Sequence, residues 1–156
     1  MTSLPSNLLG VFENISSADQ EKIITGWSTP RSIVSFRVNN LRSSRAEVVE
    51  ELEKAALPYS VWSGWDEAFY MESIHEYTLR GLEIYKSGKI YVQSLTSMIP
   101  ALCMDVQAGQ AILDMTAAPG GKTTQIVSML GGDCRITALE KFGIRYEKLD
   151  HTIRAQ

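Results

Sequence analysis

The sequence predicts an α/β fold in which a small mixed module, residues 1–90, precedes the start of a parallel, doubly wound sheet, residues 91–156. Two observations support this prediction. The second segment reads strand, helix, strand, helix, which is the order that builds parallel sheets. The composition is 44% hydrophobic and 21% charged, as is typical of a globular chain of one or two domains.

The bulk properties point away from membrane and secreted proteins. No run of about 18 apolar residues is present, so we expect no membrane-spanning helix and no membrane partner. The N-terminus lacks the basic flank and apolar core of a signal peptide, and a cytoplasmic location is expected. Cys103 and Cys134 lie far apart and predict neither a metal site nor a disulfide, so we expect two reduced, mostly buried thiols.

In the first module, residues 16–26 read as a helix with Ser17 as its N-cap. The stretch "TPRSIVSFRVN" then reads as a strand whose even-numbered residues, Val34, Phe36 and Val38, face a core. Ser44 with a glutamate three positions later forms a capping box, which predicts a helix that ends before Pro58.

The remainder of the first module is aromatic and rich in β-forming residues. The stretch "YSVWSGWDEAFYM" predicts an extended segment interrupted at Gly64, and "LEIYKSGKIYV" predicts a hairpin around Ser87 and Gly88. Next, "QSLTSMIPALCMDV" has helical spacing, although Pro100 would bend that helix or fall in its first turn.

The second module begins with the strand "QAILDM" and the turn "TAAPGG". A helix from about Lys122 to Leu130, a second strand "CRITALE" and a helix from about Gly143 follow. The turn therefore lies between a strand and a helix, which is where parallel sheets bind cofactors.

Four interpretations of this turn compete. A phosphate loop would need glycine at position 116, where Thr116 stands, and Pro119 lacks the amide that a phosphate cradle uses. A dinucleotide fingerprint is absent because Gly120 and Gly121 are adjacent. A turn for S-adenosylmethionine fits better, and a purely architectural turn that packs a helix on a sheet is the fourth interpretation.

An S-adenosylmethionine site needs close approach of the backbone and helix amides for a carboxylate. Ala117, Ala118 and the two glycines provide small residues, and Asp114 at the end of the strand could meet the amino group of the cofactor. A second acid should bind the ribose hydroxyls from the end of the next strand. Glu140 stands there, 20 positions after Gly120, which matches the expected spacing.

The string "ILDMTAAPGGKTTQ" closely resembles the cofactor motif of the Sun-type (Fmu-like) RNA cytosine-5 methyltransferases. The upstream segment "GKIYVQSLTSMIPALCMD" and the strand "RVNNLR" resemble further parts of this family. The resemblance covers roughly residues 31–156 and is strongest from 88 to 145. It implies a Rossmann-like S-adenosylmethionine methyltransferase domain preceded by a module similar to an RNA-recognition motif.

The resemblance also implies the activity, in which a cysteine thiolate adds to C6 of a cytosine in rRNA or tRNA and C5 takes the methyl group. The cofactor-binding residues that the resemblance implies are Thr116, Ala117, Ala118, Pro119, Gly120, Gly121, Lys122 and Glu140, and Asp114 joins them as the expected partner of the cofactor's amino group.

Two departures from the family pattern stand out. Thr116 occupies a position where the family commonly has cysteine, but that residue belongs to the cofactor loop. The catalytic cysteines of the family follow Pro or Thr on later strands, and no such pair occurs in these 156 residues. Cys103 and Cys134 are poorly placed to replace them, so we assign no catalytic residue and expect the chain alone to be inactive and truncated.

Net charge is −3, yet Arg31, Arg37, Arg42 and Arg45 form a basic strip without an acid between them. In the family the N-terminal region helps to hold RNA, and these arginines are the candidate phosphate contacts. The alternative is a non-catalytic RNA-binding or assembly module that keeps the turn as architecture. Because a two-stranded parallel sheet leaves open edges, we also expect self-association through residues 135–140.

Overall fold

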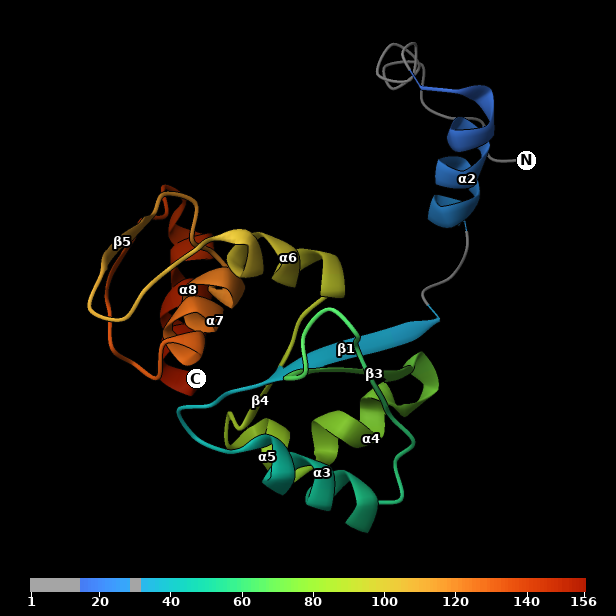
Figure 1. The fold of residues 1–156 in the computed structure, drawn as a ribbon, viewed down its shortest axis with the longest axis horizontal. Coiled ribbons are helices and arrows are strands. Elements are labelled where there is room, and N and C mark those ends of the chain that lie inside the picture. Colours follow the sequence, from blue (N-terminus) through green and yellow to red (C-terminus); the bar gives the residue numbers. More distant parts are fainter. Residues whose placement is uncertain (1–14, 29–31) are drawn as a thin grey trace. The chain divides into compact units, whose positions relative to one another are not determined.

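The structure is a computed structural model that describes residues 15–28 and 32–156, and the chain divides into two compact units, residues 1–32 and 33–156 (Figure 1). In the first unit, helix α2 spans Ser17–Ser28. Its first turn is capped by Ser16, whose Oγ accepts a hydrogen bond from the Asp19 amide at 3.3 Å. The predicted helix is confirmed, but it continues through Gly26 and Ser17 is its first residue rather than its cap.

The second unit contains a four-stranded antiparallel sheet in the order β2-β3-β1-β4. These strands are β1 (Ile33–Val38), β2 (Ser60–Val61), β3 (Ala68–Glu72) and β4 (Ile90–Val92). Strand β1 pairs with β3 on one side and with β4 on the other, so that Phe36 lies opposite both Phe69 and Val92. The predicted boundary between residues 90 and 91 falls inside β4, and residues 33–90 of the first predicted module share one compact unit with residues 91–156.

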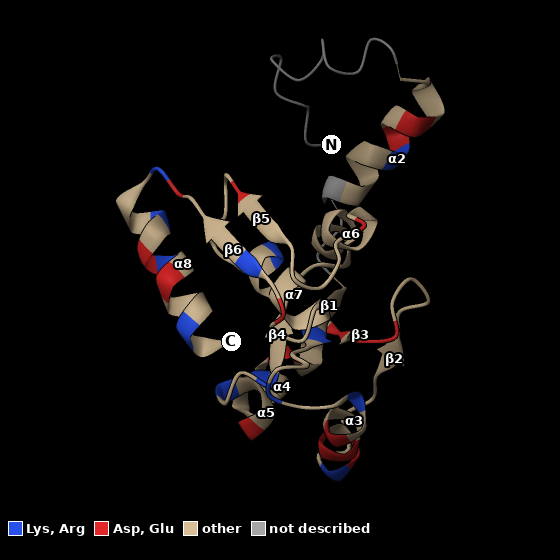
Figure 2. Cartoon of the chain, turned by 60° about the vertical axis from the view of Figure 1, so that its left-hand side comes forward, with Lys and Arg blue, Asp and Glu red and all other residues tan. Residues whose placement is uncertain are grey.

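Helices α3 (Arg45–Lys54), α4 (Glu76–Gly81) and α5 (Glu83–Lys86) accompany this sheet, and a short 3-10 helix, η2 (Ser73–His75), precedes α4. The capping box of α3 is confirmed, because Ser44 and Glu47 exchange side-chain and backbone hydrogen bonds. In Figure 2 the ribbon of α3 is red where its acidic residues stand. The connectivity of the module is therefore β-α-β-β-α-β, with two short helices in the second helical position.

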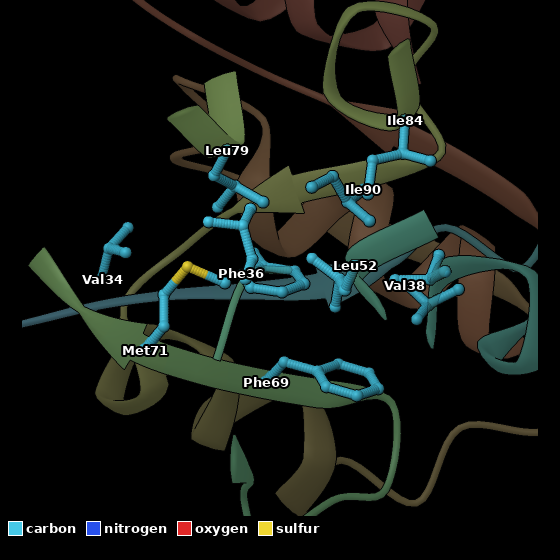
Figure 3. Close-up of a cluster of buried hydrophobic side chains, with 11 residues drawn as sticks. Val34, Phe36, Val38, Leu52, Phe69, Met71, Leu79, Ile84 and Ile90 are labelled. Carbon is cyan, nitrogen blue, oxygen red and sulfur yellow. The ribbon is translucent and has the colours of Figure 1, made fainter. Parts of the chain in front are cut away.

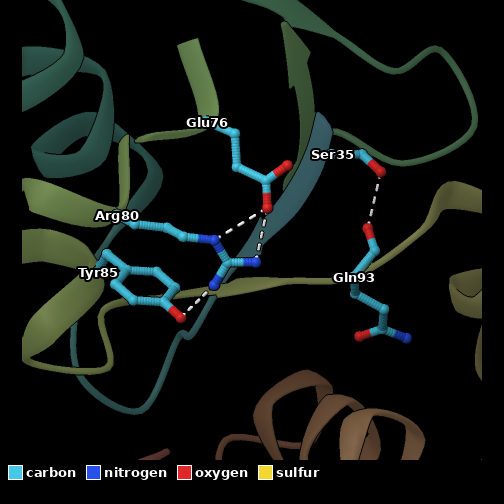
Figure 4. A network of polar contacts seen from close by, with 5 residues as sticks. All are labelled: Ser35, Glu76, Arg80, Tyr85 and Gln93. Carbon is cyan, nitrogen blue, oxygen red and sulfur yellow. Dashed lines mark hydrogen bonds and ion pairs between the residues drawn. The ribbon is translucent and has the colours of Figure 1, made fainter. Parts of the chain in front are cut away.

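The predicted hairpin at residues 82–92 is wrong, since its first half is helix α5. Ile84 is buried in the core, and Arg80 of α4 hydrogen-bonds the Tyr85 hydroxyl of α5 (Figure 4). Arg80 also donates to Glu76 from Nε at 2.9 Å and from Nη2 at 2.7 Å. Tertiary packing thus overrides the β propensity of this stretch.

The main core lies on one face of the antiparallel sheet (Figure 3). It is built by residues that are almost fully buried, namely Val34, Phe36, Val38, Val48, Leu52, Leu57, Phe69, Met71, Leu79, Ile84 and Ile90. The rings of Phe36 and Phe69 stack with centroids 5.5 Å apart. The predicted core face of β1 is confirmed, and the structure adds that Ser35 and Arg37, on its opposite face, are buried as well.

The remaining elements are α6 (Leu95–Cys103), β5 (Ala111–Asp114), α7 (Gly121–Met129), β6 (Arg135–Ala138) and α8 (Gly143–Ala155). Strands β5 and β6 pair in parallel, with Ile112 opposite Ile136 and Asp114 opposite Ala138. The predicted strand–helix–strand–helix order is confirmed. Pro100 lies inside α6, one turn beyond its start, and Ser94 caps that helix by accepting from the Ser97 amide.

Candidate functional site

The turn between β5 and α7 borders a cavity of about 300 Å³ at the carboxyl end of the parallel strands. Two segments line it: Tyr91, Val92, Gln93, Ser94 and Ser97 from β4 and the start of α6, and Asp114, Thr116, Ala117, Ala118, Pro119, Gly121 and Lys122 from the turn. All predicted cofactor residues except Gly120 and Glu140 therefore meet at this cavity.

Asp114, the last residue of β5, is held in a fixed orientation. Its Oδ2 accepts a hydrogen bond from the Thr123 hydroxyl at 2.6 Å, and its Oδ1 accepts from the Thr116 amide at 3.2 Å. Thr123 is itself buried in the first turn of α7. Because an ionised carboxylate offers about four lone-pair sites, Asp114 can accept further hydrogen bonds on the cavity side.

Several amides of the turn are already used inside the chain. The Ala117 amide donates to the Leu139 carbonyl at 3.0 Å, and the Gly120 amide donates to the Ala117 carbonyl at 2.7 Å. The Thr116 amide is bound to Asp114, as described above. A phosphate loop depends on converging amides that are open to the ligand, so this hydrogen bonding disfavours the phosphate interpretation.

The two glycines of the turn have close neighbours inside the chain. Gly120 precedes α7 with a φ of +107°, and a Cβ there would lie 3.0 Å from the side chain of Thr152 on α8. A Cβ on Gly121 would lie 3.2 Å from the Tyr91 ring. Small residues at this turn therefore let α8 and β4 approach it closely.

Glu140 lies two residues after β6, at the same end of the parallel strands as the turn. The Leu139 amide donates to the Asp114 carbonyl at 2.8 Å, which ties the two strand ends together. Arg145 connects the turn to Glu140. Its Nη2 donates to the Ala118 carbonyl at 3.0 Å, and its Nε lies 3.3 Å from Glu140 Oε2. The Glu140 side chain is 5% exposed and its Oε1 accepts from the Phe142 amide at 3.0 Å.

The sequence interpretation missed the opposite wall of the cavity. Gln93 and Ser94 follow β4 directly, and Ser97 of α6 accepts a hydrogen bond from Lys122 Nζ at 3.1 Å. The signal was present in the glutamine and small residues that precede the α6 pattern. The sequence does not show that these residues lie beside the turn, because β4 pairs with β1, a strand more than 50 positions earlier in the chain.

The predicted arginine strip is divided by the structure. Arg37 is fully buried, so it does not offer its guanidinium to an RNA phosphate, and burial lowers its pKa to about 10. Arg42 is exposed, but its guanidinium donates to the carbonyls of Gln156, Ser87 and Arg154. Arg45 is exposed, with Cζ 6.0 Å from the Phe69 ring, and Arg31 lies outside the described residues.

The cysteines differ from the expected buried pair. Cys103 is exposed at the end of α6, and Cys134 is half-buried directly before β6, at the end of the strand opposite the turn. Neither lines the cavity. Within residues 15–28 and 32–156 no cluster of metal-ligating side chains occurs. In that same part of the chain, no helix is long and apolar enough to cross a membrane.

A parallel strand pair, a small-residue turn and an acid after the second strand define a mixed α/β protein. Comparison with known proteins gives the family. Residues 101–155 match the family described as 16S rRNA methyltransferase RsmB/F. The predicted family is confirmed: the chain is related to the Sun-type (Fmu-like) RNA methyltransferases along most of its length.

Three matches illustrate the relationship. The chain is 30% identical over 146 residues to the 25S rRNA (cytosine-C(5))-methyltransferase NSUN5 of Arabidopsis thaliana, covering 92% of this chain and 25% of that protein. It is 31% identical over 155 residues to ribosomal RNA small subunit methyltransferase F of Vibrio parahaemolyticus, covering 97% and 30%. The solved structure of NSun6 from Pyrococcus horikoshii with SFG matches with a TM-score of 0.81 at 18% identity, covering 97% and 62%.

Proposed function

We propose that this chain provides the S-adenosylmethionine-binding part of an RNA cytosine-5 methyltransferase. Relatives named as rRNA and tRNA cytosine-C5 methyltransferases support the proposal, as does a similar fold solved with SFG, an analogue of S-adenosylmethionine. The chain spans about a fifth to a third of the length of these curated relatives. The observation that carries the proposal is the convergence of Asp114, the turn and Glu140 at the carboxyl ends of the two parallel strands.

Each part of the site has a proposed role. Asp114 would accept hydrogen bonds from the amino group of the cofactor. The backbone amides at the start of α7 would face the carboxylate of the cofactor. Glu140 would accept hydrogen bonds from the ribose hydroxyls through the remaining lone pairs of its carboxylate. Bound there, the cofactor supplies the methyl group that C5 of a cytosine receives.

The proposed substrate is rRNA or tRNA, as the names of the relatives indicate. The N-terminal module has the strand order of a β-α-β-β-α-β fold, which supports a likeness to an RNA-recognition motif. Its sheet face that carries Ser35 and Arg37 is buried, however, so stacking of bases on that face is not proposed. We assign RNA contacts to Arg31, Arg42 and Arg45 instead.

Calorimetry with S-adenosylhomocysteine tests the cofactor role. We expect micromolar binding to the wild-type chain and at least a tenfold loss in Glu140→Gln, because the amide keeps the shape of the side chain but not its charge. Glu147→Gln, an exposed carboxylate of α8, is the matched control and should bind like wild type. Equal affinities for Glu140→Gln and the control, or binding of ATP in place of the nucleoside, would reject the proposed site.

The alternative is a non-catalytic RNA-binding or assembly module that keeps the turn as architecture. Because we expect the chain alone to be inactive, binding of S-adenosylhomocysteine separates the two functions, and transfer of tritiated methyl groups from S-adenosylmethionine to RNA tests whether the chain contains a nucleophile. The Cys103→Ser and Cys134→Ser variants serve as controls, because neither thiol lines the cavity. We expect them to leave any transfer unchanged, whereas loss of transfer in either variant would require a nucleophile inside this chain.

We further propose that a second copy of the chain pairs with the open edge of β6, residues 135–140. In the described part of the chain β6 pairs with β5 alone, and Leu139 just beyond it is 50% exposed. Light scattering over a concentration series should show a dimer. Ile136→Pro should weaken it, because the amides of Arg135 and Leu139 donate on the β5 side and strand alternation turns the Ile136 amide to the open edge. A monomer at every concentration would contradict this prediction.

A further inference from the structure

A buried polar cluster connects the antiparallel sheet to the turn and to α7. Its centre is Arg37, whose side chain leaves β1 on the face opposite the hydrophobic core. Arg37 Nε donates to Gln93 Oε1 at 3.0 Å, and Nη2 donates to Thr124 Oγ1 at 2.8 Å and to the Gly121 carbonyl at 3.3 Å. One guanidinium therefore contacts both walls of the cavity.

The contact with Thr124 reaches the end of the turn. While Thr124 Oγ1 accepts from Arg37, the same hydroxyl donates to the Gly120 carbonyl at 2.8 Å. Arg37 thus fixes the carbonyls of Gly120 and Gly121, the two residues at which the turn becomes helix α7. The planar fork of arginine suits this task, because it holds several acceptors in one rigid geometry.

The contact with Gln93 reaches α6. Gln93 Nε2 donates to Gln125 Oε1 at 3.0 Å, and Gln125 Nε2 donates to the Met98 carbonyl at 3.0 Å. The Gln93 backbone is anchored in turn, because its carbonyl accepts from the Ser35 hydroxyl at 2.7 Å (Figure 4). Elements on three sides of the cavity, namely β4, α6 and α7, are therefore joined through Arg37.

The chemistry of Arg37 indicates a role beyond general stability. The three oxygens that accept its hydrogen bonds are all neutral, and Nη1 is buried without a partner among the described residues. The Tyr91 ring lies under the guanidinium, with Cζ 5.1 Å from its centroid. A buried cation without a carboxylate is costly, and an apolar side chain would fill the same space at lower cost.

We propose that Arg37 is a positioning residue of the cofactor site, which holds the Gly120–Gly121 end of the turn against the Gln93 wall. This inference rests on the proposed function for its effect on cofactor affinity. Its structural part, the ordering of the turn, does not depend on any ligand. The antiparallel sheet is on this account a part of the cofactor site.

Two variants test the inference. Arg37→Met removes the guanidinium and keeps a long apolar stem, and Thr124→Val removes the relay hydroxyl with almost no change in shape. Thr137→Val, an exposed threonine on β6, is the matched control for the second variant. Amide hydrogen exchange of the ligand-free chain is measured first, followed by calorimetry with S-adenosylhomocysteine.

In both variants we expect exchange at residues 120–124 to accelerate at least tenfold, while the amides of β1 and β3 stay protected. Affinity for S-adenosylhomocysteine should fall at least tenfold, and Thr137→Val should match wild type in both readouts. If Arg37→Met unfolds, Thr124→Val decides the question. Unchanged exchange at residues 120–124 in Thr124→Val would overturn the inference, as would faster exchange with unchanged affinity.

The outcomes separate this inference from the proposed function. If the wild-type chain does not bind S-adenosylhomocysteine, the proposed function fails, and exchange at residues 120–124 still decides whether Arg37 orders the turn. If the wild type binds and the variants bind equally well, the proposed function stands and the positioning role is rejected.

Discussion

Gly120→Ala is expected to reduce affinity for S-adenosylhomocysteine at least tenfold and to lower the free energy of unfolding by about 1–3 kcal/mol. The backbone of Gly120 has a φ of +107°, a conformation that side chains rarely adopt. An added Cβ would also lie 3.0 Å from Cβ and Cγ2 of Thr152, so the Thr152 side chain on α8 would have to shift by a few tenths of an ångström. Calorimetry and urea unfolding measure the two effects.

Gly143→Ala is the matched control, because Gly143 begins α8 with open space around its Cα and without a positive φ. It should behave like wild type. The double variant Gly120→Ala with Thr152→Ser removes the Cγ2 contact but not the backbone strain, and should recover part of the loss. Wild-type behaviour of Gly120→Ala would show that the turn tolerates a side chain and that its geometry is not specified by packing.

Phe36→Ala should cost about 3–5 kcal/mol of unfolding free energy, the range found when a large buried aromatic side chain is truncated. Phe36 is fully buried, stacks on Phe69, and lies on the central strand of the antiparallel sheet. Its neighbour Arg37 points to the opposite face. Loosening β1 should therefore also weaken the turn, which amide exchange would reveal at residues 120–124.

Tyr77→Ala is the matched control for Phe36→Ala, since Tyr77 is an aromatic residue that is 90% exposed. We expect it to change stability by less than about 0.5 kcal/mol. Chemical unfolding at several urea concentrations gives both values. A loss of under about 1 kcal/mol for Phe36→Ala would contradict the assignment of the core to this face of the sheet.

Local patterns predicted much of this fold because the physical signals were themselves local. The capping box at Ser44 and Glu47 and the alternation around Phe36 were read correctly. The spacing from Gly120 to Glu140 placed both residues beyond the carboxyl ends of the parallel strands, as the structure shows. These features depend on a few neighbouring residues or on one strand–helix–strand unit.

The predictions that were wrong depended on contacts between distant segments. The stretch around Tyr85 is helical because Ile84 enters the core and Arg80 contacts Tyr85. Arg37 looked like a surface cation, yet its partners lie 56 and 87 positions along the chain, in Gln93 and Thr124. No local pattern reports such pairings, so the far wall of the cavity was missed for the same reason.

The central claim is that the edge formed by the turn at residues 116–122 and by Glu140 binds S-adenosylmethionine. Titration of S-adenosylhomocysteine into the ¹⁵N-labelled chain, followed by amide NMR shifts, tests it directly. The account predicts that the largest shifts occur at residues 114–122 and 139–141. A different cavity is lined by residues that include Tyr59, Tyr70 and His75. Largest shifts at that cavity, or no shifts at millimolar ligand, would contradict the claim.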